Sequence, residues 1–259
     1  MQLAYELSGP DDAPVVVLIH GITESHHSWR PVIEELHADH RVLAVDLRGH
    51  GASATGTAYD PLSYAGDVAE TVAALGLREP LVVGHSLGGV VATAYPLVGA
   101  CVAVVNVDQP LRLAGFKDAL APLAPMLNGT AEQFAAAMAM IFGQMDGPLP
   151  PDERERIAAG ARPDQQVVLG TWAGVMNSAP EELDALVEQI AAGVAVPYLA
   201  VHGSEPGAEY VEWLTRLIPT ATVEVWTDHA GGNLGHYPQL VDTQRFLTRL
   251  AAFEHQARG

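Results

Sequence analysis

The sequence predicts an α/β fold in which a mostly parallel sheet is flanked by helices and interrupted by a helical insert. Short continuous runs of Val, Ile and Leu alternate with helical stretches in residues 1–108, and strand-like runs return in residues 196–259. Runs of this kind are typical of strands buried on both faces, and their alternation with helices indicates a parallel sheet. Residues 109–195 instead contain helical patterns and no convincing strand run.

The expected elements follow in chain order. Before residue 109 we expect strands at Val15–Ile19, Arg41–Val45, Leu81–Val83 and Cys101–Val107, separated by helices at Trp29–His37, Ser63–Leu75 and Leu87–Leu97. The insert is expected to hold helices at Leu111–Leu127, Ala131–Phe142, Pro151–Val175 and Ala179–Ala192. Strands at Val196–Val201 and Thr222–Trp226 then precede a last helix near Asp242–Phe253. We therefore predict that residues 1–108 and 196–259 form one α/β core and that residues 109–195 form a helical cap inserted into it.

The composition argues against several classes of partner. The chain has 259 residues, 49% of them hydrophobic, and a formal charge of −18 from 31 acidic and 13 basic side chains. Phosphate backbones and anionic lipids repel such a protein, so we expect neither nucleic acid nor a membrane as partner. No apolar stretch approaches the roughly 18 residues of a membrane span, no secretory signal is seen, and the single cysteine, Cys101, cannot form an internal disulfide. These features predict a cytoplasmic protein and leave the oligomeric state open.

A serine stands in a tight turn between a strand and a helix. The strand run at Leu81–Val83 leads into Gly84-His85-Ser86-Leu87-Gly88, and helical sequence follows. This G-x-S-x-G pattern in a strand–turn–helix context is typical of a serine nucleophile, because a very tight turn leaves no room for side chains two residues to either side. The beginning of the following helix also favours developing negative charge at that place. We predict Ser86 to be the nucleophile and His85 to be a packing residue rather than the base.

Four segments together resemble the α/β-hydrolase-fold superfamily of serine hydrolases. They are HGIT at 20–23, DLRGHGAS at 46–53, GHSLGG at 84–89 and GHYP at 235–238, and the likeness covers nearly all of the chain outside 109–195. The resemblance is specific for the fold and for a serine mechanism, but not for a substrate. Asp46, Arg48 and His50 are expected to tie the second segment together.

The resemblance also places the base and the oxyanion donors. A serine needs a base within hydrogen-bond reach, and His236, between the last strand and the last helix, occupies the superfamily's position for it. His229, in the same loop, is the alternative. The resemblance further implies that the backbone N–H groups of Ile22 and Leu87 stabilise the oxyanion, a contribution on the order of 3 kcal/mol per donor in the transition state.

The acid of the triad has two candidates. The superfamily pattern H-G-x-x-D would place aspartate where this chain has Pro206, so Glu205 lies one residue early and is the preferred acid if the loop is one residue shorter. Asp108 is the alternative, because it follows an earlier strand at the edge of the sheet where catalytic residues collect. Glu209 is a third and weaker candidate.

The cap composition suggests the substrate. The insert is rich in Ala, Leu and Met, which suits its own core and a hydrophobic pocket over Ser86. We predict a hydrolase of a small neutral apolar carboxylic ester, with no cofactor and no catalytic metal. The same superfamily also includes lactone hydrolases, C–C bond hydrolases and cofactor-free peroxidases. A small-ligand receptor with vestigial hydrolysis is the alternative from another class.

Overall fold

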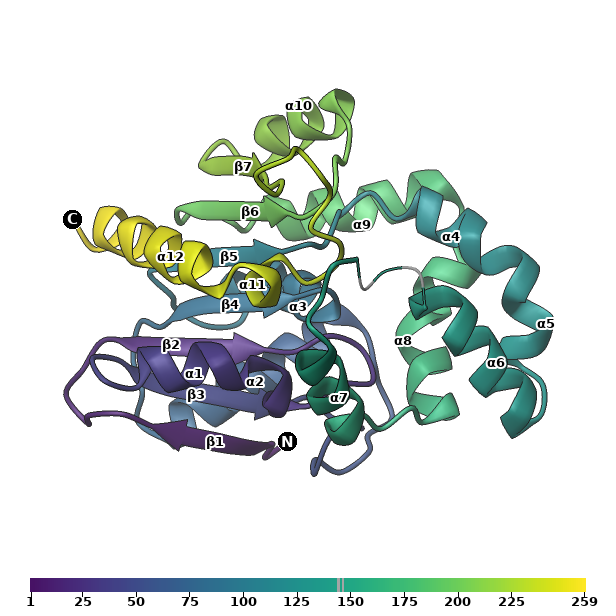
Figure 1. Ribbon diagram of the computed structural model, residues 1–259, viewed down its shortest axis with the longest axis horizontal. Helices are drawn as coiled ribbons and strands as arrows, with labels where there is room; N and C mark the ends of the chain where they lie inside the picture. The colour runs from purple at the N-terminus through teal and green to yellow at the C-terminus, as the bar shows by residue number, and fades with distance from the viewer. Residues whose placement is uncertain (144, 146) are drawn as a thin grey trace.

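The computed structural model describes residues 1–143, 145 and 147–259, and its centre is a seven-stranded sheet (Figure 1). The strand order is β1-β3-β2-β4-β5-β6-β7, and only β1 runs antiparallel to its neighbour. The strands are β1 (Ala4–Ser8), β2 (Val15–Ile19), β3 (Arg41–Asp46), β4 (Leu81–His85), β5 (Ala103–Val107), β6 (Tyr198–His202) and β7 (Ala221–Val225). The predicted α/β architecture with a mostly parallel sheet is confirmed.

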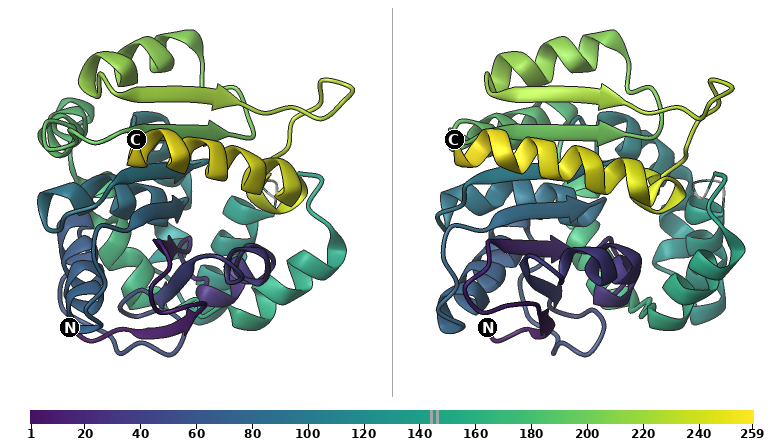
Figure 2. Two further views of the ribbon diagram at one scale, coloured as in Figure 1. Left: turned by 90° about the vertical axis from the view of Figure 1, so that its left-hand side faces the viewer. Right: turned by 60° about the vertical axis from the view of Figure 1, so that its left-hand side comes forward.

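Helices cover both faces of this sheet (Figures 1 and 2). On one face, α1 (Arg30–Leu36) and α12 (Thr243–Arg258) pack on strand residues such as Val16 and Leu18. On the other face, Val17 and Ile19 meet helices that include α2 (Pro61–Ala74), α3 (Leu87–Ala94) and α10 (Ala208–Leu217). Side chains that alternate along β2 therefore serve two cores, which explains why the whole run is apolar. The remaining short helices of these layers are η1 (His26–Trp29), η2 (Tyr95–Leu97) and α11 (Pro238–Val241).

The chain between β5 and β6 is helical throughout its regular elements in the described residues. It forms α4 (Ala114–Leu120), η3 (Ala121–Leu123), α5 (Ala124–Leu127), α6 (Ala131–Phe142), α7 (Pro151–Gly160), α8 (Gln165–Asn177) and α9 (Pro180–Ala191). Figure 1 shows α4, α5, α6 and α8 grouped beyond the carboxyl ends of the parallel strands. Their apolar side chains form a separate cluster that includes Phe134, Met138 and Trp172.

The helix α9 contacts both this group, through Leu183, and the helices that cover the sheet. Its residues Val187, Ile190 and Ala191 pack in the same cluster as α2, α3 and α10. The long helix expected over Pro151–Val175 is two helices, because the chain is extended around Pro163. We propose that residues 1–108 and 196–259 form the core and 109–195 the inserted cap, with α9 as the part of the insert that docks on the core.

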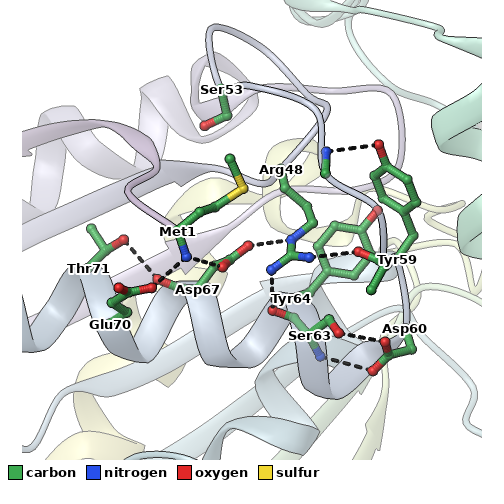
Figure 3. Close-up of polar contacts among 12 residues, drawn as sticks. Met1, Arg48, Ser53, Tyr59, Asp60, Ser63, Tyr64, Asp67, Glu70 and Thr71 are labelled. Carbon is green, nitrogen blue, oxygen red and sulfur yellow. Dashed lines mark hydrogen bonds and ion pairs between the residues drawn. The ribbon is translucent and has the colours of Figure 1, made fainter.

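An ion pair holds the loop that follows β3 (Figure 3). Nε of Arg48 donates to Oδ2 of Asp67 on α2 at 2.5 Å, and its two terminal nitrogens donate to the carbonyls of Ala58 (2.8 Å) and Ser63 (3.2 Å). Arg48 thus ties the segment at 46–53 to residues 58–67, whereas bonds within the segment come from Asp46, which accepts from the N–H of Ala52 at 2.8 Å, and from His50, whose Nδ1 lies 2.9 Å from the carbonyl of Arg48. The ion pair matters for the site because Tyr59, next to Ala58, lines the cavity described below.

No helix within the described residues is long and apolar enough to cross a membrane.

Candidate active site

Ser86 occupies a strained turn between β4 and α3. Its φ is +53° and its ψ is −122°, a backbone conformation that costs a residue with a side chain about 1–3 kcal/mol. A Cβ at Gly84 would lie 1.8 Å from the carbonyl oxygen of Gly88, and a Cβ at Gly88 would lie 2.2 Å from that of Ile19. Both glycines of the G-x-S-x-G pattern are therefore required by backbone contacts, as the sequence predicted.

Neighbouring elements hold this turn in place. The N–H of Ser86 donates to the carbonyl of Val107 in β5 at 3.0 Å, and its own carbonyl accepts from Gly89 at 2.7 Å. Leu87 is the first residue of α3, so its N–H has no partner within that helix. Both Ser86 and Leu87 line a cavity of about 410 Å³.

His236 and Asp108 form a buried hydrogen-bonded pair at the same cavity. Nδ1 of His236 lies 2.7 Å from Oδ2 of Asp108, and the two residues are 7% and 8% exposed. Because a carboxylate only accepts, Nδ1 carries the proton and Nε2 remains as the basic nitrogen. Burial alone would raise the pKa of the Asp108 carboxyl, but the hydrogen bond and charge of His236 hold it below its ordinary value.

The loop after β6 donates a backbone hydrogen bond to Asp108. The N–H of Gly203 donates to Oδ1 of Asp108 at 2.8 Å, and the N–H of Asp108 donates to the carbonyl of Val201 at 2.7 Å. Asp108 itself has a positive φ of 51°, which is a second strained residue at the site.

The preference for Glu205 as acid does not agree with this geometry. Glu205 is exposed, and its Oε1 accepts a hydrogen bond from the N–H of Gly207 at 3.1 Å. The turn at 203–207 directs this carboxylate into its own loop, while Asp108 already occupies Nδ1 of His236. Glu209, in the first turn of α10, and His229 are also exposed. The structure therefore brings together the alternative acid, Asp108, with His236.

The loop with the first His-Gly pair presents Ile22 to the cavity. His20 is fully buried, which lowers its pKa and keeps its ring neutral. Its Nδ1–H donates to the carbonyl of Gly21 at 2.6 Å, and its Nε2 accepts from the N–H of Leu47 at 3.1 Å. The peptide bond between Gly21 and Ile22 is trans, so the N–H of Ile22 points in the direction opposite to the Gly21 carbonyl, which His20 holds in place. Ile22 lines the cavity together with Leu87.

The cavity is apolar apart from the triad candidates and a few polar groups. Tyr59 comes from the loop after β3, whereas Phe116, Phe142 and Trp172 come from α4, α6 and α8. Phe116 meets the Trp172 ring edge-on, with ring centroids 5.4 Å apart. The predicted overlap between the core of the cap and the lining of a pocket over Ser86 is therefore observed.

Sequence reasoning missed a buried polar group beside the triad candidates. Glu24 is 5% exposed, and its Oε1 lies 3.7 Å from Nδ1 of His85. His85 packs as predicted, but its Nε2 also donates to the main-chain carbonyl of His236 at 2.7 Å. The local sequence around Glu24 carries no signal for this, because the contact joins residues far apart in the chain.

Comparison with known proteins identifies the family of this chain and finds solved structures with the same fold. The alpha/beta hydrolase fold profile matches residues 14–169, so the chain belongs to this family. A solved hydrolase from Pseudomonas aeruginosa PA01 superposes with a TM-score of 0.76 at 24% identity, over 97% of this chain and 93% of that one. The esterase RhEst1 from Rhodococcus sp. ECU1013 superposes with a TM-score of 0.70 at 25% identity, over 97% and 94%.

Curated relatives with different activities are also similar. A non-heme chloroperoxidase of Streptomyces lividans is 30% identical over 266 residues, which is 92% of this chain and 92% of that protein. Epoxide hydrolase 4 of Mus musculus is 30% identical over 117 residues, 42% of this chain and 33% of that protein. The magnesium-chelatase 30 kDa subunit of Rhodobacter capsulatus is 34% identical over 52% of this chain and 49% of that protein. The alignments with the epoxide hydrolase and the chelatase subunit thus span about a third and a half of those proteins.

Proposed function

We propose that the protein is a serine hydrolase that acts on a small neutral apolar carboxylic ester through Ser86, His236 and Asp108. The observation that carries this proposal is the strained turn of Ser86, which opens into the same cavity as the buried His236–Asp108 pair. A strained backbone at a cavity is commonly part of a mechanism. Membership of the alpha/beta hydrolase fold family supports hydrolysis as the reaction class.

The geometry supports a two-step mechanism. Oγ of Ser86 attacks the ester carbonyl while Nε2 of His236 takes the hydroxyl proton, and Asp108 stabilises the imidazolium that forms. The proton passes to the departing alcohol, which leaves an acyl-enzyme. Water then attacks the acyl carbon, His236 takes the proton of the water, and the carboxylic acid leaves as Oγ recovers its proton.

Two backbone amides are proposed as oxyanion donors. They are those of Ile22, whose peptide is fixed through the Gly21 carbonyl, and Leu87, at the beginning of α3. An amide at the first turn of a helix favours negative charge, and such donors act most strongly where water is excluded. The apolar cap over the cavity supplies that exclusion.

The lining favours an uncharged substrate. Among the described lining residues the cationic side chain is Arg112, and its Nη2 lies 3.5 Å from Oδ2 of Asp184 while its guanidinium lies over the Trp213 ring. An arginine engaged in this way offers little to an anionic group. Apolar side chains from α4, α6 and α8 instead offer contact to an alkyl or aryl group.

A second candidate function is cofactor-free peroxidation by the same triad. The observation in its favour is the similarity to the non-heme chloroperoxidase over 92% of both chains. Lactone hydrolysis and C–C bond hydrolysis use the same nucleophile and base and remain alternatives within the fold, and a small-ligand receptor with vestigial turnover is the alternative outside enzymes.

A single set of assays separates these functions. We expect wild type to hydrolyse short p-nitrophenyl esters and to be labelled by a fluorophosphonate, and Ser86→Ala to do neither. A wild-type protein that is folded but neither labels nor turns over any ester would refute the hydrolase proposal. Ligand-induced thermal stabilisation without turnover would indicate the receptor, and peroxide-dependent halogenation above the ester rate would indicate the peroxidase.

A further inference from the structure

Three buried polar residues lie beside the proposed triad without reaching the cavity. Glu24, His85 and Tyr237 are 5%, 1% and 7% exposed, and they are not among the described residues that line the cavity. They come from the loop after β2, the end of β4 and the turn before α11. Burying a polar group costs free energy unless it is hydrogen-bonded or paired, so the contacts of these three side chains show what each one holds in place.

His85 holds the main chain of the proposed base. Because a carbonyl only accepts, Nε2 of His85 carries a proton and donates it to the carbonyl of His236 at 2.7 Å. The N–H of His236 donates to the carbonyl of Met145 at 2.8 Å, so both polar groups of this residue's backbone are engaged. The His85 and His236 rings also lie against each other, with centroids 4.6 Å apart.

Glu24 holds the loop of the proposed oxyanion donor. Its Oε2 accepts from the N–H of Gly21 at 3.3 Å, and its own N–H donates to the Gly21 carbonyl at 3.3 Å. Its Oε1 accepts from the hydroxyl of Tyr237 at 2.9 Å. Glu24 therefore contacts the oxyanion loop on one side and the residue that follows His236 on the other.

Glu24 and His85 shift each other's pKa in opposite directions. Burial alone would raise the pKa of Glu24, but the neighbouring His85 ring, whose Nδ1 lies 3.7 Å from Oε1, lowers it to about 2. Burial alone would lower the pKa of His85, yet Glu24, the His236 carbonyl and the charge of Asp108 raise it above its ordinary value. The Tyr237 ring also packs on the His85 ring, with centroids 4.7 Å apart.

We propose that Glu24 and His85 are positioning residues of the hydrolase: a buried ion pair that joins the oxyanion loop at Gly21 to the base at His236. This inference rests on the proposed function. The pair fixes the backbone of both elements relative to Ser86, which directly follows His85. It also places the His85 ring against the His236 ring, with centroids 4.6 Å apart, where two positive charges would disfavour each other.

The test compares pH–rate profiles of ester hydrolysis. Glu24→Gln keeps the shape of the side chain and removes the charge. We expect kcat to fall about tenfold, less than the roughly 10²–10⁴-fold that a well-placed general base contributes in full, because the base is displaced and not removed. KM should change less than about twofold because Glu24 does not reach the cavity. On the acidic side of the profile, which we call the acidic limb, the pH at which kcat/KM declines should rise by on the order of one unit. His85→Gln should move the limb in the same direction.

A matched control exists elsewhere in the chain. Glu254 is a buried carboxylate whose Oε2 lies 2.8 Å from Nε2 of His40, between α12 and the loop before β3. Glu254→Gln also removes the charge of a Glu–His pair, but its kcat and acidic limb should match wild type. Should Glu24→Gln fail to fold, the Glu24→Gln/His85→Gln double variant, which leaves no unpaired charge, carries the same expectation.

A second readout needs no substrate. In ¹⁵N histidine spectra at pH 7, we expect His85 to be an imidazolium in wild type and neutral in Glu24→Gln. A neutral His85 in wild type, a wild-type acidic limb in Glu24→Gln, or an equal shift in Glu254→Gln would each overturn the inference. Absence of ester turnover would instead refute the proposed function, and the spectra would still report on the charge of the pair.

Discussion

Replacing Asp108 by Asn is the sharpest test of the proposed triad. The change keeps the size of the side chain and an oxygen that can accept from Gly203, but it removes the charge that faces Nδ1 of His236 at 2.7 Å. At an effective dielectric constant of about 20, a unit charge pair at this distance is worth about 6 kcal/mol, which is an upper figure for the imidazolium formed in the transition state. Because about 1.4 kcal/mol is tenfold in rate, we expect kcat/KM to fall by about 10³–10⁴-fold.

The assay is steady-state hydrolysis of a p-nitrophenyl ester, with the rate of fluorophosphonate labelling as a second measure of nucleophile activation. Glu205→Gln is the matched control, since that carboxylate is exposed and bonded within its own loop. It should stay within about twofold of wild type, as a surface substitution away from the site. The reasoning is refuted if Asp108→Asn, shown to be folded by circular dichroism, keeps more than a tenth of the activity, or if Glu205→Gln loses orders of magnitude.

Three further predictions concern the turn, the cavity and stability. Gly84→Ala places a Cβ 1.8 Å from the Gly88 carbonyl, so the turn must shift, and labelling of Ser86 should slow by roughly 100-fold; an unchanged rate would contradict the required contact. Trp172→Ala removes a 5% exposed ring from the cavity wall, so it should cost about 3–5 kcal/mol in urea denaturation and shift ester preference toward longer acyl chains; an unchanged chain-length profile would contradict its role as lining. Glu254 raises the pKa of His40 above 6.5, so this pair's stabilisation is fully present below pH 6.5 and is lost as pH rises through the raised value. In Glu254→Gln the unfolding free energy should therefore fall less steeply as the pH rises above 6.5, and a slope equal to that of wild type would contradict this.

Much of the fold was predictable because its signals are local. Buried strands such as β2 and β4 read as continuous apolar runs, and the two glycines around Ser86 mark a turn that only glycine permits. The missed elements include β1 and α10. The strand β1 is a half-exposed edge strand whose AYELS sequence is not an apolar run, and α10 lies between two expected strands in a segment for which no element was expected.

The proposed triad acid was not predictable by position, because two strand ends offer a carboxylate and the choice depends on three-dimensional contacts. Asp108 contacts His236 from a backbone with a φ of 51°, and the run of residues before it does not mark a positive φ at that position. The Glu24–His85 pair was missed for a related reason, since burial of both partners is decided by packing between β2, β4 and the turn before α11.

The two His-Gly turns of the chain take opposite parts in the site. In the first, the Gly21 carbonyl accepts from His20, and the peptide that it fixes presents the N–H of Ile22. In the second, the N–H of Gly203 is the donor and its acceptor is Asp108. A Cβ at Gly203 would lie 2.1 Å from the carbonyl of Gly235, directly before His236, so this glycine also lets the loop of the base approach. The second turn therefore needs no carboxylate of its own, because its backbone holds the carboxylate that β5 supplies.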